Sequence, residues 1–252
     1  MMSFRHPLSR KVYHLEAKLG EIASRVVAAG DPDRIAKAAS LLENPKVVSR
    51  KRGYLVVTGE YSGVPVTLAT HGIGAPSAAI IFEELAMLGA KLIIRAGTCG
   101  ALNPHAESGT IALIEAAAYV NSGTMKMYFG EVSMPAYATP EVVLALEREL
   151  RSMGLKYMRG ISLSHDAFHK VEVRAKEWAE LGVDFLEMEA AALFTISRHR
   201  GILAGAVALV VDNLVSGSEL TEGREELELK MIEAALRAAT SLPLPAPLLQ
   251  ES

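Results

Sequence analysis

The sequence predicts an α/β fold in which helices and strands alternate around one central sheet. Short apolar runs bounded by glycines alternate along the chain with segments whose apolar residues recur at helical spacing. Between residues 64 and 95, a strand, a helix and a second strand follow one another in the order of a right-handed, parallel βαβ unit. The 252 residues contain no internal repeat and no linker, so we expect one domain over residues 1–252, with a peripheral leader (1–11) and tail (241–252).

The composition argues against several classes of function. Half of the residues are hydrophobic and the formal net charge is −3, which is typical of a soluble globular protein and unlike a nucleic-acid-binding surface. The single cysteine, Cys99, cannot form an internal disulfide, and no Cys/His cluster indicates a metal site. We find no apolar run of membrane-spanning length and no signal-peptide core, and therefore expect a cytoplasmic protein.

The first strand is expected at Arg25–Ala29, followed by a strand-to-helix turn at residues 30–34. Asp31 is a suitable N-cap, Pro32 suits the first helical position, and apolar residues then recur at helical spacing. A helix N-terminus favours anions and Arg34 adds a full positive charge, so this turn is a candidate anion site. The alternative is a capped helix that carries a surface arginine.

A hairpin and a helix are expected next. Ser62 and Gly63 form a two-residue turn signal between strands at residues 54–61 and 64–70. A helix with an apolar stripe starts at Pro76 and stops at Gly89. The connecting sequence HGIGAPS lacks the third glycine of a dinucleotide-binding motif, so it is weak evidence for such a site.

Residues 91–102, KLIIRAGTCGAL, are the stretch around which we expect the functional site. The apolar run predicts a buried central strand with Arg95 at its carboxyl end, followed by a glycine-containing turn that includes Thr98. Ligands of open α/β sheets bind outside the carboxyl ends of strands, and a buried arginine requires an anionic partner. Thr98 and the glycine N–H groups could hold an oxyanion. The alternative is an arginine paired with an internal carboxylate.

The middle of the chain gives weaker signals. A strand is expected at residues 110–115, then a long, partly mobile loop over a site at 121–138, and then a helix at 141–153. A strand at 160–163 leads into the polar turn SHDAFH. Phe168 in this turn is either a core residue or a stacking platform at a pocket mouth.

Two acidic motifs follow in the last third of the chain. A strand at residues 183–186 runs into Glu187, Met188 and Glu189 at a helix start, where carboxylates could accept hydrogen bonds from a ribose diol or simply favour the helix dipole. The apolar strand at 202–211 ends in Asp212, whose carboxyl could act as a proton donor or as an Asx cap. An amphipathic helix at residues 222–240 follows them.

These motifs, taken in order, resemble the nucleoside phosphorylase family of hexameric purine nucleoside phosphorylases, uridine phosphorylases and archaeal methylthioadenosine phosphorylases. The matching segments are YHLEAKLGEIASRV (13–26), GDPDR (30–34), KRGYLVVTGEY (51–61), THGIGAPS (70–77), EELAMLGAKLIIRAGTCGAL (83–102), SHDAFH (164–169), EMEAAALF (187–194) and VVDN (210–213). They span nearly the whole chain in the family's order, and together they are highly specific.

The resemblance implies an α/β domain around a mixed, partly barrel-like sheet, assembled into dimers and usually hexamers whose sites are shared across the dimer interface. It also implies the substrate contacts. These would be Gly30, Arg34, Arg95, Thr98 and the neighbouring subunit's Arg52 for phosphate, Met188, Glu189 and the neighbour's His14 for ribose, and Phe168, Leu186, Glu187 and Asp212 for the base.

The implied reaction is phosphorolysis of an N-glycosidic bond, which gives a free base and (deoxy)ribose 1-phosphate. Arginines, Arg95 above all, would hold and orient the phosphate that captures the positive charge developing on the sugar. In the purine branch, Asp212 would donate a proton to the departing base. Phosphate is a co-substrate, and no cofactor or metal is expected.

The motifs resemble enzymes of two different substrate classes. The Asp212-Asn213 pair and Phe168 resemble the purine enzymes, whereas GDPDR also resembles the uridine enzymes. The latter use a glutamine and an arginine where this chain has Glu172 and Arg174. We therefore expect a purine nucleoside. Uridine phosphorylase is the alternative, followed by methylthioadenosine phosphorylase, a nucleosidase that uses water, and a non-catalytic nucleoside-binding protein.

Overall fold

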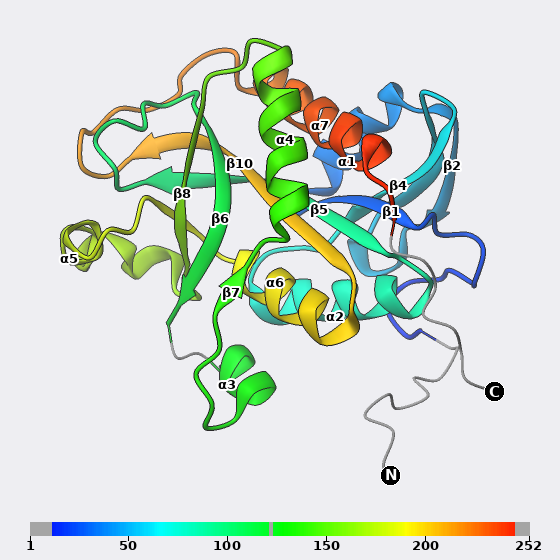
Figure 1. The fold of residues 1–252 in the computed structure, drawn as a ribbon, viewed down its shortest axis with the longest axis horizontal. Helices are drawn as coiled ribbons and strands as arrows, with labels where there is room; N and C mark the ends of the chain where they lie inside the picture. Colours follow the sequence, from blue (N-terminus) through cyan, green and yellow to red (C-terminus); the bar gives the residue numbers. More distant parts are fainter. Residues whose placement is uncertain (1–11, 121–122, 245–252) are drawn as a thin grey trace.

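Ten strands and seven α-helices make up the regular structure of the described residues, 12–120 and 123–244 of a computed structural model (Figure 1). The strands are β1 (Arg25–Ala29), β2 (Glu43–Ser49), β3 (Val56–Tyr61), β4 (Val64–Thr70), β5 (Leu92–Ala101), β6 (Ile111–Tyr119), β7 (Ala136–Tyr137), β8 (Tyr157–Ser164), β9 (Phe185–Glu187) and β10 (Leu203–Asn213). The α-helices are α1 (Pro32–Ala38), α2 (Ala75–Met87), α3 (Gly123–Phe129), α4 (Pro140–Ser152), α5 (Ala175–Glu180), α6 (Ala190–Arg200) and α7 (Arg224–Ser241). Three 3₁₀ turns, η1 (Ala39–Leu41), η2 (Lys51–Gly53) and η3 (Phe168–Val173), complete the set.

All ten strands belong to one sheet, part of which closes on itself. The strands β10, β6, β8, β9 and β5 are neighbours in that order, and β10 also pairs with β5, so these five form a ring. From β5 the sheet continues through β1, β4, β3 and β2. Parallel pairs such as β1–β5 and β5–β10 occur beside antiparallel pairs such as β6–β10. The expected α/β fold with a mixed, partly barrel-like sheet is therefore confirmed.

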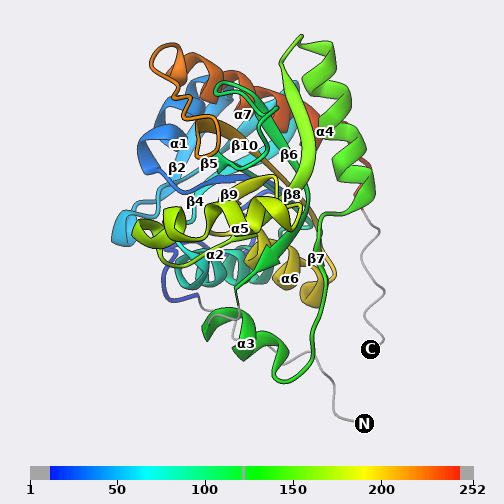
Figure 2. The ribbon, with the colours of Figure 1, turned by 90° about the vertical axis from the view of Figure 1, so that its left-hand side faces the viewer.

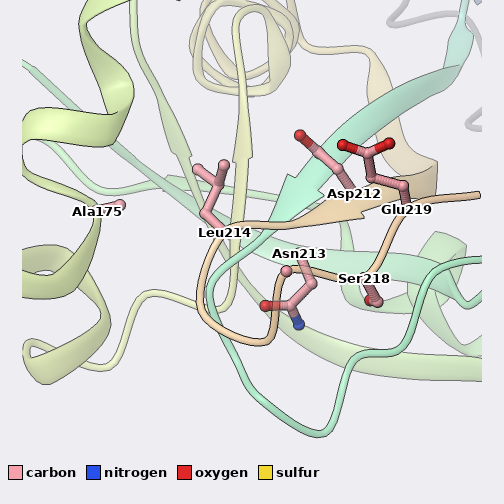
Figure 3. Close-up of a pocket in the computed structure, with 7 residues that line it drawn as sticks. Ala175, Asp212, Asn213, Leu214, Ser218 and Glu219 are labelled. Carbon is pink, nitrogen blue, oxygen red and sulfur yellow. The ribbon is translucent and has the colours of Figure 1, made fainter.

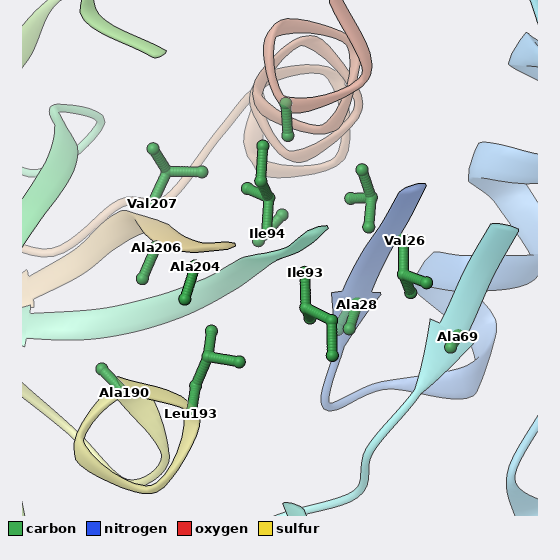
Figure 4. Close-up of a cluster of buried hydrophobic side chains, with 14 of the residues drawn as sticks. Val26, Ala28, Ala69, Ile93, Ile94, Ala190, Leu193, Ala204, Ala206 and Val207 are labelled. Carbon is green, nitrogen blue, oxygen red and sulfur yellow. The ribbon is translucent and has the colours of Figure 1, made fainter. Parts of the chain in front are cut away.

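Helices cover both faces of the central strands. The pair α2 and α6 packs on one face, and the pair α4 and α7 packs on the other (Figures 1 and 2). The strands fit between these two helix pairs because successive side chains of a strand point to opposite faces of the sheet, as Figure 4 shows. Ile94 and Val207 face α7, whereas Ile93 lies on the side of Leu193 in α6, and all four are fully buried.

Several local expectations are confirmed. Asp31 caps α1 by accepting a hydrogen bond from the Asp33 N–H group at 2.8 Å, and Pro32 opens the helix. The strands β3 and β4 form the expected antiparallel hairpin. Its turn residues Ser62 and Gly63 both have positive φ, as a tight two-residue hairpin turn requires.

The expected turn after Arg95 is wrong, because β5 continues for six further residues to Ala101. Pairing with β10 along this whole length holds the strand extended. Gly97 leaves room for the Arg95 side chain, which folds back over its own strand, because a Cβ on Gly97 would lie only 2.4 Å from Nη1 of Arg95. Arg95 thus lies in the middle of the strand, where β5 passes the end of its shorter neighbour β1.

The loop expected at residues 121–138 is also wrong in its described part. Residues 123–129 form α3 and residues 136–137 form β7, which pairs with β6, while residues 121–122 lie outside the described structure. The polar strand β2 carried no alternating apolar signal in the sequence and becomes a strand through its pairing with β3. The expected leader and most of the expected tail, residues 245–252, also lie outside the described residues.

Within residues 12–120 and 123–244, no helix combines the length and the apolarity that a membrane crossing requires.

Candidate active site

Three neighbouring strands bring polar residues together at one edge of the sheet. In the β1–β5 pair, Ala28 lies opposite Arg95, and in the β1–β4 pair, Ala29 lies opposite Thr70. Gly30 and His71, which follow these two strands, therefore lie beside each other. A Cβ on Gly30 would lie 3.0 Å from the carbonyl oxygen of Gly72, so any larger residue would crowd this carbonyl group.

Arg95 is buried and held by two carboxylates. Its Nη2 donates a hydrogen bond to Glu189, and its Nη1 lies 3.8 Å from Glu187, within range of charge but not of a hydrogen bond. Burial by itself would lower the pKa of the guanidinium, but the charges of Glu189 and Glu187 outweigh this and raise it. Nε and Nη1 are buried and donate to no acceptor of the described chain. The internal ion pair considered from the sequence is thus present, and two donors remain available for an anion.

Arg34 is held in a similar way from the opposite side. It is only 7% exposed, and its Nη2 donates to Oε1 of Glu228 on α7 at 2.9 Å. Glu228 also accepts a hydrogen bond from Arg224 at the start of α7. Burial acts to raise the pKa of Glu228, but the hydrogen bonds from Arg34 and Arg224 prevail and hold it below its usual value. The Nε atom of Arg34 is buried and has no acceptor within the described residues.

His71 completes this group, and the sequence analysis did not single it out. Its ring is fully buried, and Nδ1 lies 2.7 Å from the carbonyl oxygen of Gly72. Burial and then the positive charge of Arg95 hold its pKa well below the usual range; the bond to Gly72 opposes this, and Arg34 adds to the lowering. The available signal was a polar residue directly after the apolar strand β4.

Glu187 anchors the start of α6. One of its oxygens accepts hydrogen bonds from the hydroxyls of Ser162 and Ser164, and the other accepts from the backbone N–H groups of Glu189 and Ala190 at 2.8 and 2.7 Å. These bonds use the acceptor sites of a carboxylate fully. Glu187 is thus a structural centre that holds β8, β9 and α6 together.

Glu189 and Met188 lie at the same junction. Glu189 is 4% exposed and joins Arg95 to the Gly74 N–H group, from which it accepts a hydrogen bond of 2.6 Å. Met188 is half-buried. The junction therefore ties the helix start of α6 to the segment before α2 through one carboxylate.

A cavity of about 330 Å³ lies at the carboxyl end of β10 (Figure 3). Its lining residues are Ala175, Asp212, Asn213, Leu214, Gly217, Ser218 and Glu219. The carboxyl groups of Asp212 and Glu219 lie side by side, and the backbones of the two residues form a β-bridge. A volume of this size is in the usual range of small-molecule sites.

Asn213 builds the wall of this cavity. It is 1% exposed, its Nδ2 donates to the carbonyl oxygens of Asn103 and Ala106, and its Oδ1 accepts from the N–H groups of Val215 and Ser216. The side chain thereby fixes the loop that follows β10 against the loop that follows β5.

Cys99 lies on β5 between Arg95 and Gly100, the residue that pairs with Asp212. Burial raises the pKa of the Cys99 thiol, and Arg95, Glu187 and Asp212 lie near enough for their charges to act on it. Leu186 is buried and lies opposite Gly100 in the β9–β5 pair, between these regions. Residues that lie far apart in the sequence therefore share one region of the sheet.

The remaining residues predicted from the sequence lie further out. Thr98 is half-buried on β5, and Phe168 is 67% exposed at the start of η3. His14 pairs with Glu84 of α2 at 2.8 Å, and Arg52 is exposed on η2 with a φ of 54°. Neither His14 nor Arg52 forms a hydrogen bond or ion pair with the arginine site in the described chain.

Among the residues that the structure describes, no three or more His, Cys, Asp or Glu side chains are grouped as a metal site would require.

Comparisons with known proteins agree on one family. Residues 24–242 match the family model described as the phosphorylase superfamily. The chain is 36% identical to a uridine phosphorylase of Thermococcus kodakarensis, covering 88% of this chain and 84% of the relative. It is 32% identical to a guanosine phosphorylase of Halorubrum lacusprofundi, covering 91% and 98%. The crystal structure of a purine nucleoside phosphorylase from Toxoplasma gondii in complex with immucillin-H superimposes with a TM-score of 0.83 at 26% identity, over 94% of this chain and 98% of that one.

Proposed function

The chain belongs to the phosphorylase superfamily, and from this premise we propose that it is a nucleoside phosphorylase that cleaves purine nucleosides with inorganic phosphate. The products are the free base and (deoxy)ribose 1-phosphate, so the enzyme is a pentosyltransferase. Phosphate is a co-substrate, and the reaction uses no cofactor. The relatives named above, which are uridine, guanosine and purine nucleoside phosphorylases, support the reaction class.

The observation that carries the phosphate assignment is the pair of buried arginines beside Gly30. Arg34 and Arg95 retain three buried N–H donors that no acceptor of the described chain satisfies. Unsatisfied buried donors are costly, and a multiply charged oxyanion provides the acceptors that they need. A nucleosidase that attacks with water has no use for two such arginines.

The geometry supports a mechanism of positioning and electrostatics. Arg34 and Arg95 bind phosphate and orient one oxygen toward the sugar carbon on which positive charge develops. Glu189, held beside Arg95, provides a carboxylate for the sugar hydroxyls. The glycosidic bond breaks as the phosphate oxygen bonds to the sugar, and Asp212 transfers its proton to the departing base.

The cavity beside Asp212 favours a purine. Two carboxyl groups, Asp212 and Glu219, face the same side of this cavity, and a purine ring nitrogen can accept a proton from one of them. Uracil recognition in the resembling enzymes uses an arginine, which would be Arg174 here. Arg174 instead forms a bidentate pair with Glu177 at 2.7 and 2.9 Å on the exposed surface.

Uridine is the second candidate substrate. Uridine phosphorylases stand among the relatives, and Ala175, the neighbour of Arg174, lines the cavity. If Arg174 left Glu177, its guanidinium would be at the cavity's edge. This alternative therefore rests on one exposed ion pair, which is weak in general.

We further propose that the active enzyme is a homo-oligomer in which Arg52 and His14 act on the neighbouring subunit's site. Arg52 is exposed, belongs to no ion pair of the described chain and has an unusual left-handed backbone. Non-glycine residues in this conformation occur preferentially at functional sites.

A substrate panel tests the function. Inosine, guanosine, adenosine, methylthioadenosine and uridine are each incubated with the protein, with and without phosphate, and base release is measured by chromatography. We expect purine release that requires phosphate. Rapid uridine cleavage with poor purine cleavage would establish the second candidate, and release without phosphate would identify a nucleosidase.

The variant Arg95→Met tests the phosphate site directly. Loss of this buried charge partner should reduce the stabilisation of the transition state by about 2–5 kcal/mol and so slow phosphorolysis strongly. The matched control is Arg159→Met, because Arg159 pairs with Glu115 at the exposed surface. Circular dichroism of both variants separates a loss of function from a loss of folding.

A further inference from the structure

Four atoms in the arginine site are buried and have no hydrogen-bond partner in the described chain. They are Nε of Arg34, Nε and Nη1 of Arg95, and Nε2 of His71. The three arginine atoms are N–H donors, which suits any oxyanion. The histidine atom differs, and its chemistry determines which oxyanion fits best.

The proton of the His71 ring is assigned by its partner. Nδ1 lies 2.7 Å from the carbonyl oxygen of Gly72, which can only accept a hydrogen bond, so Nδ1 carries the proton and donates. The ring is fully buried, and the charges of Arg95 and Arg34 act on it, so it stays neutral. In a neutral ring whose Nδ1 is protonated, Nε2 carries a lone pair and can only accept a hydrogen bond.

The position of this acceptor follows from the strand order. Gly30 directly follows β1, which lies between β5, the strand of Arg95, and β4, the strand that His71 follows. A Cβ on Gly30 would lie 3.5 Å from Cε1 of His71, the ring carbon bonded to Nε2. Neighbouring strands lie about 4.8 Å apart. The edge of the His71 ring that carries Nε2 thus lies against Gly30 on the β4 side, and Arg95 belongs to the strand on the other side of β1.

A site with several donors and one acceptor fits an anion that has several bare oxygens and one O–H group. Phosphate near neutral pH has this form, because both of its common species keep at least one proton. Sulfate has the same shape but no proton, so its oxygen would face the lone pair of Nε2 without a hydrogen bond. An unpaired buried acceptor of this kind is a means of rejecting the wrong ligand.

We propose that His71 is a specificity-determining residue that accepts a hydrogen bond from the protonated oxygen of phosphate and thereby selects phosphate over fully deprotonated oxyanions such as sulfate. The inference rests on the proposed function, since it concerns the same site. It also assigns the oxygens: the protonated one faces His71, and the bare ones face Arg34, Arg95 and the sugar. Arsenate, which keeps a proton as phosphate does, is expected to bind similarly.

Two substitutions separate the two nitrogens of the ring. In His71→Asn, the amide can replace Nδ1 as the donor to Gly72, but nothing occupies the position of Nε2. In His71→Gln, the longer side chain places an amide oxygen near the position of Nε2 and gives up the bond to Gly72. Binding of phosphate, arsenate and sulfate to the whole protein is measured by titration calorimetry in a buffer free of these ions.

The wild-type protein should prefer phosphate and arsenate to sulfate by about 10- to 100-fold, the range expected for one hydrogen bond to a charged group. His71→Asn should lose most of this preference by weakening phosphate, with little change for sulfate. His71→Gln should retain more of it.

Two results would overturn the proposal. The wild-type protein could bind sulfate as tightly as phosphate, which tests the idea even if no variant folds. His71→Asn could keep the full preference. If, in that second case, the ratio of ribonucleoside to deoxyribonucleoside turnover also changed, the lone pair would be assigned to a sugar hydroxyl. A failure of phosphate-dependent base release would reject the proposed function separately, because the binding measurement does not depend on turnover.

Discussion

In the proposed function, the carboxyl group of Asp212 donates the proton that a departing purine needs. This residue follows a register shift between Val210 and Asp212 in the β10–β5 pair, and this irregularity directs the end of the strand into the cavity beside Glu219. An irregular residue in a strand commonly redirects a side chain next to an active site. Replacing Asp212 by asparagine would remove the proton that this carboxyl group can donate while keeping the shape of the side chain.

Asp212→Asn should therefore slow the chemical step with purine nucleosides by about 10²–10⁴-fold, the usual range for general acid catalysis, with little effect on binding. A nucleoside whose base carries a positive charge and leaves without protonation serves as the control and should be spared. Single-turnover kinetics measures the step directly. Equal losses for both nucleosides would mean that Asp212 binds the base and does not protonate it.

His71 gives the protein a characteristic response to acid. The unfolded residue takes up a proton below its ordinary pKa of about 6.5, whereas burial and the neighbouring Arg95 hold the folded residue neutral to much lower pH. The unfolded state then binds more protons, so the free energy of unfolding decreases as the pH falls below about 6.5, by at most ~1.4 kcal/mol per pH unit.

Denaturant titrations at pH 7.5 and 5.5 measure this slope. We expect His71→Gln to reduce it, because the titrating group is gone, and His199→Gln, at an exposed position on α6, to leave it unchanged. Identical slopes in the wild type and both variants would show that His71 is not held neutral in the folded protein.

At the scale of the elements, the start of α6 depends on one side chain, that of Glu187. Glu187 accepts hydrogen bonds from two serines of β8 and from the first N–H groups of α6, and it lies beside Arg95. Removing it would leave these donors buried without acceptors. A helix start with unsatisfied donors and a weakened buried ion pair is strongly destabilised.

Glu187→Ala should lower the free energy of unfolding by about 3–5 kcal/mol, or the melting temperature by roughly 5–20 °C. Glu141→Ala, at an exposed position in the first turn of α4, is the matched control and should change stability by less than about 0.5 kcal/mol. Thermal unfolding followed by circular dichroism compares them. A melting temperature for Glu187→Ala equal to that of the control would contradict the anchoring role.

The elements also show what the sequence could reveal. Asp31, Pro32 and the Ser62-Gly63 turn act through their own backbones, so local patterns predicted α1 and the β3–β4 hairpin correctly. The strand β5 was cut short because its glycines suggest a turn, whereas the partner that keeps it extended, β10, is about a hundred residues away in sequence. Pairing over such a distance leaves no local trace.

The same reasoning applies to the site. Arg34 and Arg95 stood out because a charge beside an apolar strand is costly and therefore informative. His71 did not, since a histidine before a helix is ambiguous until the adjoining strand β1 brings Gly30 against its ring. The partners Glu228 and Glu189 come from α7 and from the start of α6, and only the folded arrangement of these elements selects them.

On the scale of the whole molecule, the proposed assembly makes each site depend on two chains. His14 is held in place by Glu84, which also accepts hydrogen bonds from the backbone N–H groups of Tyr13 and Leu15. These bonds fix the segment against α2. A fixed His14 and an exposed Arg52 are suited to reach a neighbour's site.

Mixing subunits tests this. Arg52→Ala and Arg95→Ala proteins should each be nearly inactive, whereas an equal mixture after subunit exchange should recover up to about a quarter of wild-type activity, because half of the dimers are mixed and each of these has one intact site. Arg52→Ala mixed with wild-type protein provides the exchange control. Activity in a species that sedimentation shows to be monomeric would refute site sharing.

The burial of Cys99 has a practical consequence for the ring of five strands. Thiol reagents attack the thiolate, and Cys99 is 4% exposed with a pKa raised by burial, so the folded protein should react very slowly. Labelling then requires the paired strands β5 and β10 to separate, so the labelling rate measures how often they do. A ligand that binds only the closed form should slow labelling by the factor 1 + [L]/Kd. Since no second cysteine competes for the reagent anywhere in the chain, one mass measurement over time would report occupancy of the site without any turnover.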